Sequence, residues 1–344
     1  MRVLVVRVGA MGDVLHALPA VAALKRARPH WKIGWVVEPR WRALLESNEG
    51  NRTVVDRVHL ARTGEWKRRP ISSGTMDSIA ALRRELRGCR YEMCIDLQGS
   101  VRSSLIGWMA GAGRYIGPAE PREAAARWMY KRRVETRRRH VVEQAFELVE
   151  AALGEGMWCK PVELPVDDGA EEWSDGVVGR EARMVLLAPT AGWGAKQWPA
   201  LRFGEVARAL AAAGYTVMVN AAGQNDPVAQ AVVEASGGGA QRVTSSLGQM
   251  IALVRRAALV IAGDTGPLHL AAALGRPVVG LYGPTDPART GPWETRSRVL
   301  RDASSVTDHR RHSSTEAGLL RIGVDQVLKA AMDLLGECAK DVRI

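Results

Sequence analysis

Cysteine is scarce in this chain, and no pattern links the few that occur. The four cysteines among 344 residues are Cys89, Cys94, Cys159 and Cys338, and none forms a C-x-x-C pair or lies near a cluster of histidines. This spacing favours neither a structural zinc site nor a disulfide framework, because both need cysteines that are grouped along the chain. We therefore expect a protein of a reducing compartment, the cytoplasm.

Long apolar runs are missing as well. No window approaches the roughly 18 uninterrupted apolar residues of a transmembrane helix. We expect no signal peptide in the N-terminal string MRVLVVRVGAMGDVLH, because Arg7 interrupts its apolar run and Asp13 follows soon after. The string predicts a buried strand that enters a loop.

Several catalytic signatures are absent. The chain has no isolated D-x-D after a strand, which a metal-dependent glycosyltransferase would need, and no G-x-S-x-G nucleophile elbow. It also lacks the G-x-G-x-x-G spacing of dinucleotide-binding folds and the G-x-x-x-x-G-K-[ST] spacing of a P-loop. We therefore expect neither a bound metal nor a cofactor.

Positive charge is present in excess, and it is unevenly distributed. The formal net charge is +11, from 48 Lys and Arg against 37 Asp and Glu. Residues 1–167 hold 29 of the basic and 19 of the acidic residues, or +10, which leaves 19 and 18, or +1, for the remainder. A basic N-terminal half indicates an anionic partner such as nucleic acid, anionic lipid or an acidic sugar.

Strand and helix signals alternate along the chain in two series. Alternation of this kind predicts parallel sheets covered by helices, and the length suits two domains of about 150 residues each. A Pro- and Gly-containing stretch with an acidic cluster, residues 154–179, predicts the linker. We expect two Rossmann-like domains, residues 1–165 and 166–323, followed by a C-terminal helix, residues 324–344, that packs back on the first domain.

The first candidate site is the string GAMGDVLH at Gly9–His16, which follows the first strand and opens a helix. Asp13 falls near the first turn of that helix, at the carboxyl end of the strand. A carboxylate there can accept a proton from a sugar hydroxyl. The alternative is that Asp13 only caps the helix, and spacing alone favours the cap.

Two further candidates lie in the second half. In GDTGPLH at Gly263–His269, a strand ends and a helix begins, so the N–H groups of Thr265 and Gly266 would point at a phosphate. The alternative is a capped, buried helix with a core histidine. In TAGWGAKQWP at Thr190–Pro199, Lys196 can meet a diphosphate as a mobile charge, although a flexible surface loop is the commoner structure.

The N-terminal half also holds a basic set interleaved with aromatic residues, which suits an anionic membrane interface or nucleic acid. A solvated helix face is the alternative for at least half of these residues. Its members are Arg62, Lys67, Arg68, Arg69, Arg102, Arg122, Arg127, Lys131, Arg132, Arg133 and Arg137 to Arg139, with Trp66, Trp128, Met129 and Tyr130 between them.

Four ordered strings together resemble the bacterial lipopolysaccharide heptosyltransferases, glycosyltransferase family 9, and most of all the heptosyltransferase I type. They are MRVLVVRVGAMGDVLHALPA at the N-terminus, IDLQGSVRSS at Ile95–Ser104, KQWP at Lys196–Pro199 and GDTGPLHLAAALGRPVVGLYGPTDP at Gly263–Pro287. The resemblance covers about residues 1–335. The chain departs from the family at Gln144, where an Arg is frequent, and at Ser245 or Ser246, where a Met near the adenine is typical.

The resemblance implies a GT-B fold, two Rossmann-like domains facing a central cleft, and an inverting, metal-independent transfer of heptose from ADP-heptose to Kdo-lipid A. Asp13 matches the general base. The donor-binding positions are Thr190, Lys196, Asp226, Asp264, Thr265, Gly266 and His269, with Asp226 near the position of the family's acidic ribose ligand. The expected acceptor-binding positions are Gly12, Arg62, Lys67, Gln98, Arg102 and Arg122. Peripheral binding to the anionic cytoplasmic face of the inner membrane would follow.

Other assignments remain open at this stage. A heptosyltransferase II-like enzyme or another core glycosyltransferase would carry the same motifs. A nucleic-acid-binding protein would use the basic half and would give Asp13 no function, although we expect no specific nucleic acid as partner. Asp13 and Lys196 argue against a catalytically silent sensor of nucleotide sugars.

Overall fold

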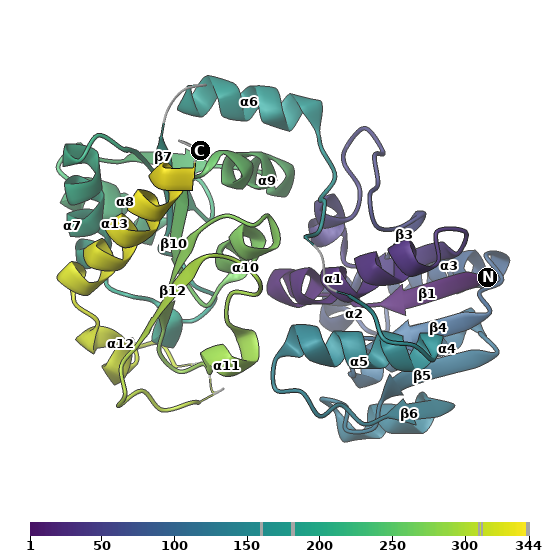
Figure 1. Cartoon of the computed structure of the whole chain (residues 1–344). Helices are drawn as coiled ribbons and strands as arrows, with labels where there is room; N and C mark the ends of the chain where they lie inside the picture. Colours follow the sequence, from purple (N-terminus) through teal and green to yellow (C-terminus); the bar gives the residue numbers. More distant parts are fainter. Residues whose placement is uncertain (159–160, 180–182, 309, 311, 342–344) are drawn as a thin grey trace. The chain divides into compact units, whose positions relative to one another are not determined.

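The computed structural model describes residues 1–158, 161–179, 183–308, 310 and 312–341, and it divides into two compact units (Figure 1). The first unit is Met1–Val166 and the second is Asp167–Ile344. Cys159 lies outside the described residues; Cys89, Cys94 and Cys338 are free thiols. Among the described helices, none combines the length and the apolar character needed to cross a bilayer.

The first unit is built on a six-stranded parallel sheet in the order β3-β2-β1-β4-β5-β6. Its strands are β1 Arg2–Val6, β2 Lys32–Val37, β3 Arg57–Leu60, β4 Met93–Asp96, β5 Arg114–Pro118 and β6 Arg132–Val134. The two central strands read as continuous apolar runs because both faces of the sheet are covered. Every residue of β1 after Arg2 is buried.

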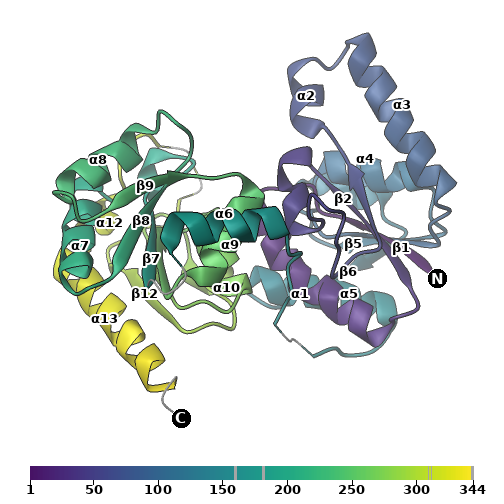
Figure 2. The ribbon, with the colours of Figure 1, turned by 90° about the horizontal axis from the view of Figure 1, so that it is seen from above.

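Helices cover both faces of this sheet (Figure 2). The helices are α1 Met11–Ala27, η1 Pro39–Leu44, α2 Thr63–Arg68, α3 Ser73–Gly88, α4 Val101–Ala110, η2 Ala124–Met129 and α5 Val141–Leu153. Helices α1 and α5 pack together on one face. On the other face, Leu82 and Leu86 of α3 and Ile106 of α4 form one core with Leu4 and Val6 of β1.

The second unit repeats the plan with the strand order β12-β11-β10-β7-β8-β9. Its strands are β7 Met184–Ala188, β8 Thr216–Ala221, β9 Gln241–Thr244, β10 Leu259–Gly263, β11 Val278–Tyr282 and β12 Ser297–Arg301. Its helices are α6 Asp168–Val178, η3 Gly194–Lys196, α7 Ala200–Ala212, α8 Pro227–Ala235, α9 Leu247–Arg256, α10 Gly266–Ala273, α11 Pro287–Thr290, α12 Ala317–Arg321 and α13 Val324–Asp341.

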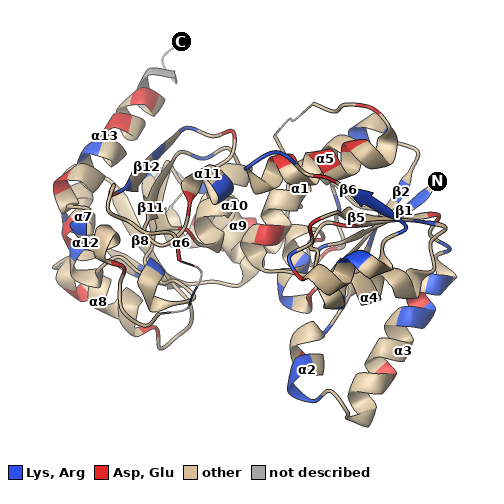
Figure 3. Cartoon of the chain, turned by 90° about the horizontal axis from the view of Figure 1, so that it is seen from below, with Lys and Arg blue, Asp and Glu red and all other residues tan. Residues whose placement is uncertain are grey.

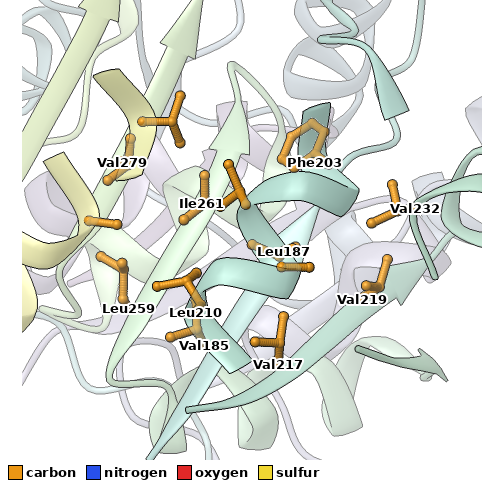
Figure 4. Close-up of a cluster of buried hydrophobic side chains, with 14 of the residues drawn as sticks. Val185, Leu187, Phe203, Leu210, Val217, Val219, Val232, Leu259, Ile261 and Val279 are labelled. Carbon is orange, nitrogen blue, oxygen red and sulfur yellow. The ribbon is translucent and has the colours of Figure 1, made fainter. Parts of the chain in front are cut away.

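One large apolar core fixes this second sheet (Figure 4). Alternate side chains of the central strands, such as Leu187, Val219 and Ile261, meet Phe203 and Leu210 of α7. The C-terminal helix α13 packs against α7 and against strands β10, β11 and β12 of its own unit. Its expected return to the first unit remains a prediction.

Both sheets have the strand order of the doubly wound fold, which confirms the predicted α/β class. Renumbered within its unit, each order becomes 3-2-1-4-5-6. The order reverses between β1 and β4 in the first unit and between β7 and β10 in the second. Ligands of such folds bind at the carboxyl ends of the strands beside this reversal. The four loops expected to bind ligands therefore follow β1, β4, β7 and β10.

A 3₁₀ segment, Pro39–Leu44, follows β2, with Pro39 at its first position. One stretch differs from the sequence-based expectation. The expected linker, residues 154–179, contains helix α6, whose N-cap Asp167 accepts a hydrogen bond from Ala170 N at 3.0 Å. Part of that polar, Gly-containing stretch is therefore a surface helix, which packs on α9.

Candidate functional site

In the first unit, Asp13 lies at the start of α1, directly beyond the carboxyl end of β1. Its Oδ2 accepts a hydrogen bond from Ala10 N at 3.1 Å, so the carboxylate does stabilise the helix N-terminus. The side chain nevertheless stays 37% exposed. A carboxylate offers about four acceptor positions, and the contacts with Ala10 N and Arg7 Nη2 use two of them. Asp13 therefore combines the capping contact with a solvent-accessible carboxylate.

The second contact of Asp13 is an ion pair that the sequence did not predict. Arg7 Nη2 lies 2.9 Å from Asp13 Oδ1, and Arg7 Nε donates to the backbone oxygen of Asp13 at 3.1 Å. Arg7 also donates to the backbone oxygen of Leu97, in the loop after β4. The planar guanidinium thus joins the loops that follow β1 and β4 and fixes the orientation of the Asp13 carboxylate.

The loop after β4 is held by Asp96 and Gln98. The buried Asp96 carboxylate accepts hydrogen bonds from Ser103 Oγ and Tyr130 Oη and from the N–H groups of Gln98 and Gly99. Complete burial raises the pKa of Asp96 despite these four donors. Gln98 Oε1 in turn accepts from Val8 N at 2.7 Å, so it links the same two loops as Arg7.

The other expected acceptor-binding residues lie around this edge of the first sheet. Gly12 is in the first turn of α1, and Arg102 is exposed in the first turn of α4. Arg122 is exposed, and its backbone lies beside Gly99. Arg62 and Lys67 are exposed on the segment of α2, after β3. Their assignment as acceptor ligands remains a prediction.

In the second unit, Lys196, Asp264 and His269 meet beside the reversal of strand order. Lys196 Nζ lies 2.6 Å from Asp264 Oδ2, and His269 Nε2 lies 3.0 Å from Asp264 Oδ1. Asp264 is only 6% exposed in its side chain. Burial alone would raise the pKa of Asp264, but the His269 hydrogen bond and the Lys196 charge hold that pKa well below its usual value. The carboxylate is therefore ionised and keeps Lys196 at this position.

Gly263 allows the two loops to approach each other this closely. A Cβ at Gly263 would lie 2.9 Å from the backbone oxygen of Lys196, so a side chain would push the loops apart. The Lys196 ammonium also lies 5.3 Å from the centre of the Trp193 ring, which adds a cation–π contact. Its side chain remains 16% exposed.

Helix α10 begins at the same point, with Thr265 as its N-cap and no side chain bonded to its first turn. The eight-residue helix therefore presents the backbone N–H groups of Thr265 and Gly266 at its positive end. Lys196 is held next to this end through Asp264. An anionic group, such as a phosphate, matches these donors.

Asp226 and Thr190, which were both expected to bind the donor, are in contact with each other. Asp226 is the N-cap of α8 and accepts from Thr190 Oγ1 at 2.7 Å, from Ala222 N at 2.8 Å, and from Val228 N and Ala229 N. Burial would raise the pKa of Asp226, but these donors lower it. Four donors use the acceptor positions of a carboxylate, so the geometry gives Asp226 a structural function. Its role as a ribose ligand remains a prediction.

Two buried polar atoms lie near the carboxyl ends of β8 and β9, and sequence reasoning did not find the first of them. Asn220 Oδ1, near the carboxyl end of β8, and Ser245 Oγ, just after β9, have no hydrogen-bond partner among the described residues. Strands β8 and β9 are neighbours, and Asn220 pairs in register with Val243. An unpaired buried polar atom costs about 1–3 kcal/mol, which a ligand that bonds to it would recover.

Within the described ranges, no three His, Cys, Asp or Glu side chains come together as a metal-binding group. The polar groups at the two sheet edges are instead an exposed carboxylate in one unit, and an ammonium with a helix N-terminus in the other. A carboxylate can accept a proton, and the other set can stabilise an anionic leaving group.

Residues 79–319 match the model of glycosyltransferase family 9 (heptosyltransferase). The chain belongs to this family. It is therefore an enzyme, a glycosyltransferase, as the four motifs predicted.

Individual heptosyltransferases are similar over most of their length. Lipopolysaccharide heptosyltransferase 1 of Escherichia coli K12 is 30% identical over 88% of this chain and 93% of its own. The enzyme of the same name from Pseudomonas aeruginosa is 29% identical over 87% of this chain and 83% of its own. Lipopolysaccharide heptosyltransferase 2 of Salmonella typhimurium is 25% identical over 98% and 99%.

Solved heptosyltransferase structures share the fold. The E. coli heptosyltransferase WaaC with ADP superposes with a TM-score of 0.80 at 25% identity, over 97% of this chain and 100% of that one. A family 9 glycosyltransferase from Veillonella parvula gives a TM-score of 0.82 at 23% identity, over 98% and 97%. The predicted GT-B architecture is confirmed by these neighbours.

Proposed function

We propose that this family 9 glycosyltransferase transfers L-glycero-D-manno-heptose from ADP-heptose to a Kdo residue of Kdo-lipid A, in the synthesis of the lipopolysaccharide inner core. The observation that carries this proposal is the exposed Asp13 carboxylate, fixed by Arg7 at the carboxyl ends of β1 and β4. A solved relative, E. coli WaaC, is described with ADP-2-deoxy-2-fluoro heptose, which supports the choice of donor.

In the proposed step, a Kdo hydroxyl attacks the anomeric carbon of the donor while Asp13 takes its proton. The new bond joins the hydroxyl oxygen to that carbon. The bond from the carbon to the β-phosphate oxygen breaks, and ADP leaves with the electron pair. One displacement of this kind inverts the anomeric configuration. General base assistance typically contributes a factor of about 10²–10⁴ to the rate.

The leaving diphosphate gains negative charge as the bond breaks. Lys196 and the N–H groups of Thr265 and Gly266 form a positive set at the start of α10. Such a set stabilises the growing charge without a metal ion. Asp264 is a positioning residue in this scheme, because its contact with Lys196 at 2.6 Å holds the ammonium in place.

The acceptor is rich in carboxylates and phosphates, which suits the net charge of the first unit. Arg62, Lys67, Arg102 and Arg122 are exposed on that unit. Gly12 directly precedes Asp13 in α1, and Gln98 contacts Val8 in the loop before that helix. Because the acceptor is a lipid, we place the enzyme at the cytoplasmic face of the inner membrane, bound peripherally to its anionic surface.

The test is a turnover assay with ADP-heptose and Kdo-lipid A, read by mass spectrometry of the acceptor. The proposal expects a mass increase of one heptose, at a rate that EDTA leaves unchanged. Activity that EDTA abolishes would contradict the metal-free scheme. The second candidate is a type 2 enzyme, to which the whole chain also aligns; transfer only to an acceptor that already carries one heptose would support it instead.

A further inference from the structure

A groove on the first unit, about 460 Å³ in volume, lies between α3 and α4, away from Asp13 and its loops. It combines apolar and basic side chains, and no Asp or Glu lines it. The lining residues are Met76, Ile79, Ala80, Arg83, Arg84, Arg87, Trp108 and Met109.

Two apolar side chains of this groove are exposed to solvent. Met76 is 54% exposed and Trp108 is 55% exposed, whereas Met109 is buried in the core of the unit. The buried face of α3 is formed by Leu82 and Leu86, which pack into the same core. Arg87 Nε donates to the backbone oxygen of Met109 at 2.8 Å and so links α3 to α4 beside the two exposed side chains.

Exposed apolar side chains continue beyond the groove along both helices. Ile71, just before α3, is 88% exposed, and Leu105 of α4 is 42% exposed. We call the set of Ile71, Met76, Arg83, Arg84, Leu105 and Trp108 the α3–α4 surface. Apolar residues spread over two helices in this way form a broad contact area rather than a pocket for one small molecule.

The charge of this surface is positive. Arg83 and Arg84 are exposed, and within the described chain neither takes part in an ion pair. Helix α3 also carries two acidic residues: Asp77 is exposed, and Glu85 is paired with side chains of β3. Lys and Arg gather on α2 and on the C-terminal half of α3 (Figure 3).

We infer that the α3–α4 surface docks on a bilayer that contains anionic phospholipids. This inference rests on the proposed function, in which the acceptor is a lipid. Tryptophan and methionine would enter the region between head groups and acyl chains, while the arginine side chains reach the phosphates. Helix α2, with Arg62 as its N-cap and Lys67 in its last turn, ends at Arg68 shortly before Ile71, so the docked surface would continue toward expected acceptor ligands.

The experiment measures binding of the full chain to vesicles by co-sedimentation. The probes are vesicles of phosphatidylcholine alone and of phosphatidylcholine with phosphatidylglycerol. Loss of one arginine charge from the surface should weaken vesicle binding about fivefold, since each charge contributes roughly 1 kcal/mol. The charge reversal Arg83→Glu should weaken vesicle binding further. Trp108→Ser should weaken binding about tenfold through lost apolar contact.

Matched controls lie on the second unit. Lys329→Glu reverses an exposed charge on α13, and Leu201→Ser removes an apolar side chain that is 67% exposed. Both should bind vesicles like the wild type. All four substituted positions are at the surface, so circular dichroism should report unchanged folding. Brominated lipids should quench the wild type more than Trp108→Phe.

Several outcomes would overturn the inference. They are equal binding to both vesicle types, equal weakening by the control variants, or an α3–α4 variant that changes self-association in sedimentation velocity but leaves vesicle binding intact. A separate assay with a deacylated, water-soluble acceptor distinguishes the two proposals. If the wild type turns over the water-soluble acceptor and the variants bind vesicles normally, only the docking surface is refuted. If no acceptor is turned over, the proposed function is refuted.

Discussion

Lys196 and Asp264 form an ion pair of 2.6 Å that joins the loops after β7 and β10, in a setting where the carboxylate is almost fully buried. A buried carboxylate without a partner is strongly unfavourable, so the two residues depend on each other. The pair places the Lys196 ammonium at the N-terminus of α10. A diphosphate bound there would contact both the ammonium and the backbone N–H groups of the helix.

Replacement of Lys196 should weaken donor binding and slow transfer. A hydrogen bond to a charged group contributes about 1.5–3 kcal/mol, so we expect Lys196→Ala to raise the Kd for ADP about 10-fold to 100-fold. The measurement is isothermal titration calorimetry. Lys329→Ala, an exposed lysine on α13, is the control and should bind like the wild type. Wild-type affinity in Lys196→Ala would remove this residue from the donor site.

Asp264 should make the free energy of unfolding depend on pH. Its pKa in the folded chain is well below the usual value, so the folded state stays ionised where the unfolded state takes up a proton. The resulting stabilisation is present above about pH 4, the pKa of Asp in the unfolded chain, and is lost progressively as the pH falls from there toward the much lower pKa of the folded state. Each tenfold difference in proton affinity corresponds to about 1.4 kcal/mol.

The check is a series of thermal melts of the wild type and Asp264→Asn between neutral and acidic pH. We expect the melting temperature of the wild type to fall more steeply below about pH 4. Leu201→Ser, which changes no titrating group, should keep the wild-type slope. Identical slopes in wild type and Asp264→Asn would contradict the buried ion pair.

Asp226 allows its two possible roles to be separated. As the N-cap of α8 it should contribute about 0.5–2 kcal/mol, which Asp226→Ala would lose and Asp226→Ser would largely keep. Chemical denaturation measures that difference. If Asp226 also binds ribose, both variants should lose ADP affinity. Loss of stability in Asp226→Ala with full ADP affinity would leave the residue as a cap alone.

Arg7 should affect the rate rather than donor binding. It fixes the Asp13 carboxylate through a contact of 2.9 Å, and the donor contacts are proposed in the second unit. We expect Arg7→Ala to lower kcat about tenfold or more, as loss of a charge-assisted hydrogen bond would, with an unchanged Kd for ADP. Arg7→Lys should recover part of kcat. Equal kcat in wild type and Arg7→Ala would exclude the positioning role.

The sequence predicted the parts of the fold in which local signals agree. The segments from Val3 to His16 and from Leu259 to His269 each combine a buried strand, a glycine turn and a helix start, and the structure has these elements in that order. The alternation of strand and helix signals also predicted the parallel sheets. By contrast, α6 escaped notice because its Gly-containing, acidic sequence resembles a loop, although Asp167 caps it.

Sequence reasoning could not predict those parts of the candidate site that depend on contacts between residues far apart in the chain. In the sequence, Arg7 only interrupts an apolar run, and nothing local links it to Asp13 or Leu97. The ion pair arises because β1 and β4 are neighbours in the sheet, although about 90 residues separate them in the chain. Asn220 likewise comes to lie beside Val243, shortly before Ser245, only through the pairing of β8 with β9.

The most direct test of the proposed mechanism is kcat of Asp13→Ala with ADP-heptose and Kdo-lipid A, measured beside the affinity of the same variant for ADP. The account predicts a fall in kcat of about 10²–10⁴, with unchanged ADP affinity, because the carboxylate takes the proton and does not hold the nucleotide. Turnover near the wild-type rate would contradict it.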